Sequence, residues 1–274
     1  MLFTVVVGML LSTRGLLPWR VLIFGSLGIG LVAGAAAAIN HLVDRHVDAI
    51  MARTRGRPLP RGTVSGAQVL GFAATLGGAG MWLLLAFTNG LCAALTFASL
   101  IGYAVIYSMF LKHATPQNIV IGGAAGAAPP LLGWVAVTGQ LDPGALLLFL
   151  IILVWTPPHF WALAIHRRDD YARAAIPMLP VTHGVAFTSE RILMYALALC
   201  MVTLMPFLIG MSGVPYLAGA LLLGGRFVWF AWRLRHDVRL AMPTFRYSIV
   251  YLFGLFAVLL ADHYAAAALL GPSG

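Results

Sequence analysis

The feature that most constrains the fold of this chain is a succession of continuous apolar runs, many of them about 20 residues long, the length that crosses a bilayer as a helix. A transmembrane β-barrel would instead alternate apolar and polar residues in short segments. Charged residues make up 9% of the chain, whereas a soluble domain carries about 25%. The sequence therefore predicts an all-α polytopic membrane protein with a single membrane-embedded domain, residues 1–274.

Nine apolar runs are candidate transmembrane helices. The first is too short to span a bilayer by itself, and the sixth is interrupted by Pro157-Pro158. In chain order the predicted helices are Leu2–Leu11, Val21–Val43, Val64–Phe87, Leu91–Leu111, Asn118–Val137, Gly144–Ile165, Ile192–Ile209, Val214–Trp232 and Tyr247 to about Leu270.

The basic residues are distributed unevenly between the two sides of this predicted bundle. Loops after the second, fourth, sixth and eighth helices hold 14 of the 17 arginines and lysines. Because basic residues collect in cytoplasmic loops, these loops and the N-terminus are expected in the cytoplasm and the C-terminus outside. The net charge of +9 thus reflects membrane topology and does not indicate nucleic-acid binding.

One segment, Asn40–Gly62 (NHLVDRHVDAIMARTRGRPLPRG), concentrates charge at the end of the second run. Asn40, Asp44 and Asp48 are four residues apart, so on a helix they share one face, ~6 Å per step. Carboxylates one turn apart repel each other, and a shared hard cation such as Mg²⁺ would resolve the repulsion. The alternative is a solvated helix end whose acids pair with neighbouring arginines.

A second acidic cluster, His166–Tyr171 (HRRDDY), follows the sixth run. An even number of helices separates the two clusters, so both face the same side of the membrane. Carboxylates suit a metal ion and arginines suit phosphate oxygens, so the two clusters together indicate a diphosphate ligand rather than ordinary loop ion pairs. Apolar helices around such a site favour an isoprenoid diphosphate, whose departure a metal would assist while water is excluded.

Several motifs carry a family resemblance. The pattern N-x-x-x-D-x-x-x-D leading into R-T-x-x-R-P-L resembles the first signature of the UbiA-type intramembrane prenyltransferases. YSMFLKHATPQNIVIGGAAGAAPPLLGW and TPPHFWALAIHRRDDYARAAIPMLPVTHG are similar to the protohaem IX farnesyltransferase (haem O synthase) family among them. The resemblance, from about Gly30 to Asp262, implies nine helices around a central cavity. It implies Mg²⁺-dependent farnesyl transfer from farnesyl diphosphate to a vinyl group of haem B, with water addition, giving haem O.

The resemblance also assigns site residues. It implies catalytic roles for Asp44, Asp48 and Asp170, and metal binding by these three and Asp169. Substrate binding is implied for Asn40, Arg53, Arg57, Lys112, Tyr171, His159 and Trp161, of which His159 and Trp161 lie in the P-H-F-W signature and are associated with haem. His46 departs from the family, which usually has an acid at that position.

The implied partners are farnesyl diphosphate, haem B and the lipid bilayer, with a later haem-handling enzyme or a terminal oxidase assembly and no nucleic acid. The implied location is the bacterial inner membrane. A prenyltransferase acting on a quinone precursor or another aromatic acceptor remains an alternative, and so does a membrane transporter of an amphiphilic anion. A transporter would hold its ionisable groups near the bilayer midplane, whereas these acids are expected at helix ends.

Two individual side chains have simpler interpretations. His159 follows two prolines inside a helix, and a lone membrane histidine is also an ordinary hydrogen-bonded packing residue. Arg226 lies inside the eighth run and is interpreted as a residue whose charge reaches toward the membrane surface.

Overall fold

The computed structural model describes residues 1–51 and 54–270 of the 274-residue chain, with side chains up to Ala265 except that of His113. Within these residues, eight helices are long and apolar enough to cross a membrane, and the shorter apolar helix Leu2–Leu11 precedes them. The prediction of an all-α membrane protein with nine helices, the first of them short, is therefore confirmed.

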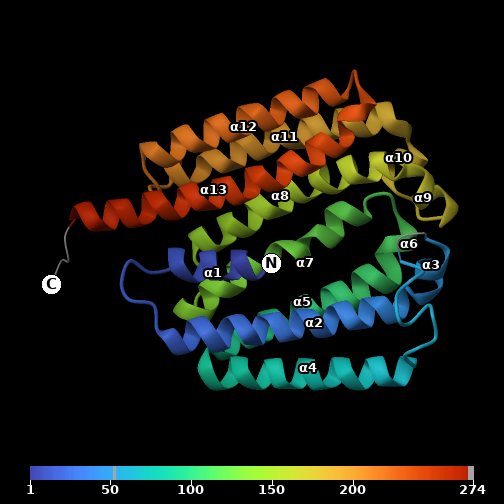
Figure 1. Ribbon diagram of the computed structural model, residues 1–274. Coiled ribbons are helices and arrows are strands. Elements are labelled where there is room, and N and C mark those ends of the chain that lie inside the picture. The colour runs from blue at the N-terminus through green and yellow to red at the C-terminus, as the bar shows by residue number, and fades with distance from the viewer. Residues whose placement is uncertain (52–53, 271–274) are drawn as a thin grey trace.

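The helices lie roughly antiparallel, and Figure 1 shows them running between two ends of an elongated bundle. Their bounds are α1 Leu2–Leu11, η1 Val21–Gly25, α2 Ser26–Val43, α3 Arg45–Ile50, α4 Gly66–Phe87, α5 Gly90–Ile101, η2 Gly102–Leu111, α6 Lys112–Ala114, α7 Asn118–Thr138, α8 Pro143–His166, α9 Arg168–Arg173, α10 Leu179–Thr182, α11 Gly184–Leu208, α12 Val214–Leu234, η3 Val238–Leu240 and α13 Ala241–Leu270. The segments η1 and η2 are π-helical and continue directly into α2 and out of α5, whereas η3 is a 3₁₀ turn.

Local sequence signals explain several helix ends. Ser65 and Gln68 form a reciprocal capping box at the start of α4, and the Asn89 side chain accepts from the Cys92 N–H at the start of α5. Gly139 ends α7 in the left-handed conformation, with φ of 69°. These caps fix the ends of the helices, which the apolar runs alone define only approximately.

Two details of the predicted helices are wrong. Helix α8 is continuous through Pro157 and Pro158, both of which are buried. Both prolines are packed inside the bundle, where neighbouring helices help a membrane helix to tolerate proline. Helix α11 begins at Gly184, eight residues before the apolar run at Ile192. Its first two turns are helical although they contain polar residues.

The short helix α1 is held against α7 by direct backbone contact. A Cβ at Gly133 would lie 2.1 Å from the Val5 carbonyl oxygen, and one at Gly8 would lie 2.0 Å from the Pro130 carbonyl oxygen. Glycine at both positions thus lets the two helices approach more closely than any side chain allows. Val5 and Met9 are consequently fully buried.

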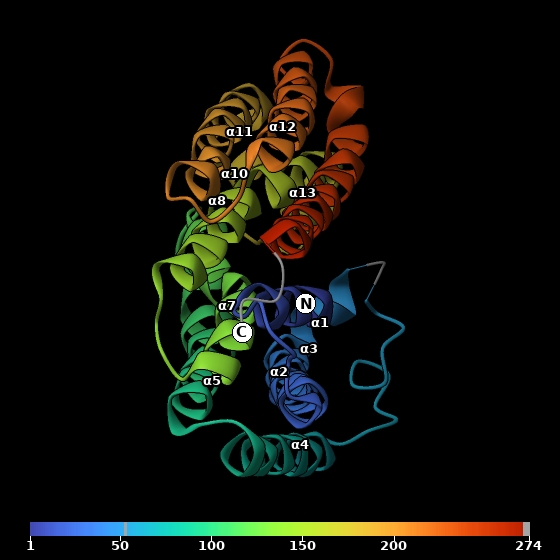
Figure 2. The same ribbon diagram turned by 90° about the vertical axis from the view of Figure 1, so that its left-hand side faces the viewer.

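Viewed along the bundle, the helices form two groups (Figure 2). One group contains α8, α11, α12 and α13, the other contains α2, α4 and α5, and α1 lies between them. Helices α7 and α8 have the largest buried shares among the candidate spans and join the two groups. The short helices α3, α6, α9 and α10 all lie at one end of the bundle, here called the polar end (Figure 1).

Candidate active site at the polar end of the bundle

Asp44 and Asp48 lie at the junction between α2 and α3. The Asp44 N–H donates to the Asn40 carbonyl at 2.9 Å, and the Asp48 N–H donates to the Asp44 carbonyl at 2.8 Å, so the helical repeat continues across the junction. Asp44 is 3% exposed and Asp48 is 5% exposed. Two carboxylates this deeply buried need compensating cations, because an unpaired buried charge is strongly unfavourable.

Asp44 obtains its cation from a distant part of the chain. The Lys112 ammonium, at the start of α6, lies 2.5 Å from Asp44 Oδ2. The other carboxylate oxygen, Oδ1, is buried and has no hydrogen-bond partner among the described residues. Asp44 therefore keeps one oxygen available to a ligand.

Asp48 is paired with a different cation. Arg57, in the loop after α3, donates to Asp48 Oδ2 at 2.6 Å and lies 2.9 Å from His41 Nδ1. The Thr54 hydroxyl donates to the Asp48 carbonyl at 3.0 Å and holds this loop against α3. Asp48, Arg57 and His41 line a cavity of about 340 Å³ between the loop and α4.

The π-helical segment η2 forms the wall opposite Asn40 and Asp44. The Ser108 hydroxyl lies 2.7 Å from Asn40 Oδ1, and the rings of Tyr103 and Tyr107 stack with centroids 5.6 Å apart. Wide π-turns are often found at functional sites because they change which side chains share a face. Ser108 and the two tyrosines were not predicted as site residues, since nothing in an apolar run marks them.

The second acidic cluster forms the short helix α9 at the same end of the bundle. Asp170 pairs with Arg173, Asp169 is exposed, and Tyr171 packs against the core. Helix α9 lies at the same end of the bundle as α3 and α6, which carry Asp48 and Lys112 (Figure 1). The prediction that both clusters share one side is thereby supported by the structure.

Helix α9 ends in a strained turn. The Ile176 N–H donates to the Tyr171 carbonyl at 3.0 Å, and the Ala175 N–H donates to the Ala172 carbonyl at 3.1 Å. These two hydrogen bonds are the pair that defines a Schellman motif. Its left-handed residue is Ala175, with φ of 50°, where glycine is usual. Strain of this kind near a candidate site indicates that the chain direction after Tyr171 is tightly determined.

The structure does not gather all predicted ligands around one point. Within the part of the chain that it describes, no three His, Cys, Asp or Glu side chains are close enough to hold one metal ion. Asp44 and Asp48 still fit Mg²⁺, because this ion commonly uses one or two protein carboxylates and completes its shell with water and phosphate oxygens. The free, buried Oδ1 of Asp44 is the observation that supports this fit.

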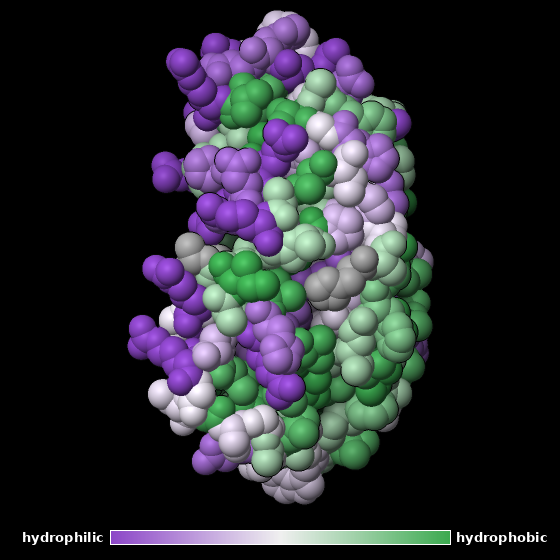
Figure 3. All heavy atoms as spheres, turned by 90° about the vertical axis from the view of Figure 1, so that its right-hand side faces the viewer, coloured by the Kyte–Doolittle hydropathy of each residue, from purple (hydrophilic) through white to green (hydrophobic). Residues whose placement is uncertain are grey.

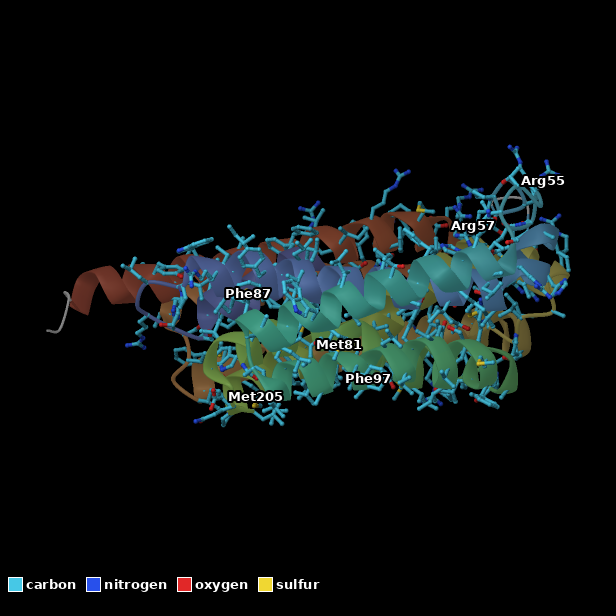
Figure 4. All side chains as sticks on the ribbon, turned by 90° about the horizontal axis from the view of Figure 1, so that it is seen from below. Arg55, Arg57, Met81, Phe87, Phe97 and Met205 are labelled. Atoms are coloured by element: carbon cyan, nitrogen blue, oxygen red, sulfur yellow. The ribbon has the colours of Figure 1, made fainter. Side chains whose placement is uncertain are left out.

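The remaining basic residues of the first motif differ in placement. Arg53 lies outside the described residues. Arg55 and Arg57 lie at the polar end, in the loop that follows α3, as Figure 4 shows. The Arg45 guanidinium donates to His46 Nε2 at 3.1 Å, and both side chains are exposed, away from the buried carboxylates. Figure 3 shows hydrophilic side chains projecting from this end of the molecule.

His159 and Trp161 are buried in α8. The His159 ring stacks between Trp155 and Phe245, with centroids at 4.1 and 4.5 Å, and its Nδ1 lies 2.6 Å from the Ser248 hydroxyl. Trp161 is fully buried, and its indole N–H has no hydrogen-bond partner among the described residues. These contacts agree with the packing interpretation of His159, and they leave no ring face of His159 open.

An apolar cavity of about 220 Å³ runs between the helices on the inner side of the site. Small side chains of α2 and α7 line it, including Ala33, Ala37 and Gly126, and Tyr103 lies among its lining residues. The Ser108 hydroxyl, 2.7 Å from Asn40 Oδ1, also lies 2.9 Å from the Tyr103 carbonyl oxygen, so the cavity lies near Asn40 of the first motif. This arrangement can hold an apolar chain with an anionic head.

Comparisons with known proteins agree with this geometry. The sequence profile of the UbiA prenyltransferase family matches residues 1–257. The chain is 65% identical over 266 residues to protoheme IX farnesyltransferase of Azotobacter vinelandii, covering 96% of this chain and 89% of that protein. It is 62% identical over 264 residues to the protein of the same name from Methylococcus capsulatus, with the same coverage.

Solved structures support the same fold. A digeranylgeranylglyceryl phosphate synthase superimposes with a TM-score of 0.82 at 17% identity, covering 96% of this chain and 93% of that one. A UbiA homologue from Archaeoglobus fulgidus bound to DMAPP and Mg²⁺ has a TM-score of 0.66 at 14% identity, with 94% of each chain covered.

Proposed function

The chain belongs to the UbiA prenyltransferase family, and from this premise we propose that it transfers the farnesyl group of farnesyl diphosphate to a vinyl group of haem B. Water adds in the same overall reaction, and the products are haem O and diphosphate. The high identity to protoheme IX farnesyltransferases along most of the chain supports this acceptor over a quinone precursor.

The observation that carries the proposal is the environment of Asp44. One of its oxygens contacts Lys112, the other is buried without a partner among the described residues, and Tyr103 on η2, the wall opposite Asp44, lines the apolar cavity. In this reading the cavity holds the farnesyl chain and the carboxylates lie at the diphosphate. Bound Mg²⁺ would neutralise the charge that develops on the departing diphosphate.

The chain's own cations complete the phosphate site. Lys112 and Arg57 each lie within hydrogen-bonding distance of a buried carboxylate, and both carry donors that suit phosphate oxygens. Arg53 is proposed as a further phosphate ligand. These donors hold the diphosphate in place, while Asn40 is fixed by Ser108 on the opposite wall.

The apolar walls supply the second requirement of the reaction. Loss of diphosphate leaves an electron-poor allylic carbon, which water would capture before the haem vinyl group could attack. A dry cavity lined by small apolar side chains excludes that water until the acceptor is in place.

The second cluster is proposed to complete the site when substrates bind. Asp170 and Asp169 supply further carboxylates, with Asp170 acting in catalysis, and Tyr171 contributes to substrate binding. His159 and Trp161 are proposed to contribute to the haem side of the site. Because both are buried in α8, they act by fixing how this helix packs. A later haem-handling enzyme or oxidase assembly is proposed as the recipient of the product.

The protein is an integral membrane protein, since eight of its described helices can span a bilayer. We place the polar end in the cytoplasm of a bacterial inner membrane, because 14 of the 17 basic residues lie in loops expected on one side.

The test uses purified protein in lipid nanodiscs with haem B, farnesyl diphosphate and Mg²⁺, and mass spectrometry of the haem. Haem O formation is expected, with a loss of about a hundredfold or more for Asp44→Asn. Glu190→Gln, an exposed carboxylate on α11, is the matched control and should retain activity. Absence of farnesylated haem, together with an Asp44→Asn variant that behaves like the wild type, would contradict the proposal.

A further inference from the structure

Arg226 carries a positive charge on the outer surface of α12, away from the proposed active site. Its side chain is exposed, and no described carboxylate lies within ion-pair distance of it. Its recorded contacts are aromatic: the guanidinium carbon lies 5.1 Å from the Tyr247 ring centroid and 5.9 Å from that of Phe230. The charge is thus held by ring faces rather than by an anion.

The depth of this charge is set by two helices. Arg226 lies eight residues before the end of α12 at Leu234, which corresponds to ~12 Å along the axis. Tyr247 lies six residues after the start of α13 at Ala241, or ~9 Å. Both helix ends meet at the polar end of the bundle (Figure 1). Arg226 and Tyr247 therefore lie about 10 Å from the polar ends of their helices, inside the candidate membrane spans.

A charge at this depth requires compensation. Contact with aromatic faces offsets only part of the cost of placing an arginine inside a membrane helix. Tyr247 cannot supply an anion, because its hydroxyl already donates to the Leu223 carbonyl at 3.1 Å. An anionic group from outside the chain would supply the remaining compensation.

A second arginine extends the same surface. Arg233 lies seven residues after Arg226, so two helical turns, ~10 Å, separate them on one side of α12. Its guanidinium carbon lies 5.1 Å from the Trp229 ring centroid, and it also has no described ion-pair partner. The seam between α12 and α13 is thus an apolar surface that carries, near one end, two arginines with no ion-pair partner in the described part of the chain.

We propose that this seam binds the phosphate of an anionic phospholipid. The phosphate lies against Arg226, the acyl chains of the lipid lie along the exposed apolar side chains of α12 and α13, and Arg233 contacts the headgroup nearer the surface. Arginines between membrane helices at the surface of an anionic leaflet bind lipid headgroups by this chemistry. A free phosphate ion would use only the charges and none of the apolar seam.

The experiment compares lipid retention by native mass spectrometry. Delipidated protein in detergent micelles is incubated with phosphatidylglycerol or with phosphatidylcholine of the same acyl chains. The wild type is expected to retain phosphatidylglycerol preferentially, and Arg226→Gln is expected to retain it about fivefold less. Arg239→Gln, which removes the same charge from an exposed site in η3, is the matched control and should retain it like the wild type.

Further arms separate the competing outcomes. Equal retention by Arg226→Gln and Arg239→Gln would overturn the site, because net charge alone would then explain binding. Displacement of the lipid by inorganic phosphate, at a constant ionic strength set with chloride, would assign the site to a free anion and overturn the lipid. Arg226→Lys, which keeps the charge but not the planar group, should lose part of the preference, and size-exclusion profiles verify that each variant is folded.

Discussion

The Ser108 hydroxyl lies 2.7 Å from the side-chain oxygen of Asn40 and joins η2 to α2 across 68 residues of sequence. Ser108 is completely buried and Asn40 is partly buried, so the contact lies largely inside the protein. The position of Asn40 therefore depends on the hydroxyl of Ser108, although η2 contributes no charged side chain to the site.

Replacing Ser108 with alanine is expected to lower the free energy of unfolding by about 1 kcal/mol and to reduce turnover, because Asn40 loses its partner. The measurements are thermal unfolding in detergent and haem O formation. Thr75→Val is the control, since it removes a hydroxyl that bonds only the Gly71 carbonyl on exposed α4. Turnover unchanged by Ser108→Ala would show that the contact does not position Asn40.

Lys112→Met is expected to destabilise the fold by about 3–5 kcal/mol, because it leaves the buried Asp44 carboxylate without its cation. Adding Asp44→Asn should recover part of that stability but no activity. The double-mutant comparison by chemical unfolding separates the structural role of the pair from its catalytic role. A double variant that is less stable than Lys112→Met would contradict the pairing.

Chelation of divalent metal is expected to abolish haem O formation, and added Mg²⁺ should restore it. Asp48→Asn should raise the Mg²⁺ concentration needed for half-maximal turnover by about tenfold, the effect of roughly 1.4 kcal/mol. Asp237→Asn, which alters a carboxylate that caps η3, should leave that concentration unchanged. Titration of Mg²⁺ in the product assay measures both values.

Ala175→Gly is expected to stabilise the protein by about 1 kcal/mol, since glycine adopts a positive φ without the steric cost paid by alanine. Ala174→Gly, one residue earlier at φ of −84°, should have the opposite sign because it increases the freedom of the unfolded backbone and removes a buried methyl group. Thermal unfolding of both variants checks this pair. Two shifts of the same sign would show that strain at Ala175 is not the cause.

Gly133→Ala is expected to cost about 1–3 kcal/mol, because the new methyl group would overlap the Val5 carbonyl and separate α1 from α7. Gly78→Ala is the matched control, as a Cβ there meets no atom within 4 Å. A difference in melting temperature is the readout. Similar melting temperatures for the two variants would mean that α1 does not depend on this contact.

Sequence reasoning predicted the membrane-spanning helices well, because continuous apolar runs fix both their number and their approximate bounds. It also placed the two acidic clusters at one end, since helix parity decides the side. The prediction that proline interrupts a helix was wrong at Pro157, where packing keeps α8 continuous. The start of α11 was predicted too late, because polar residues extend this helix beyond its apolar run.

Partners of the site residues could not be predicted in the same way. The common face of Asp44 and Asp48 suggested one shared cation, yet the structure gives each its own, Lys112 and Arg57. Which cation meets which carboxylate depends on the path of the Arg57 loop and on the π-turns of η2, and neither leaves a periodic signal in the sequence.

The separate pairing of Asp44 with Lys112 and Asp48 with Arg57 has a consequence for how ligands enter. A metal ion alone would have to compete with two cations already in place, and a diphosphate alone would attract those cations away from carboxylates that stay buried. When both ligands bind together, the metal ion neutralises the carboxylates that lose Lys112 and Arg57, and the diphosphate pairs with those two cations. The site is thus expected to act as a coincidence detector, in which metal and diphosphate bind with strong positive cooperativity.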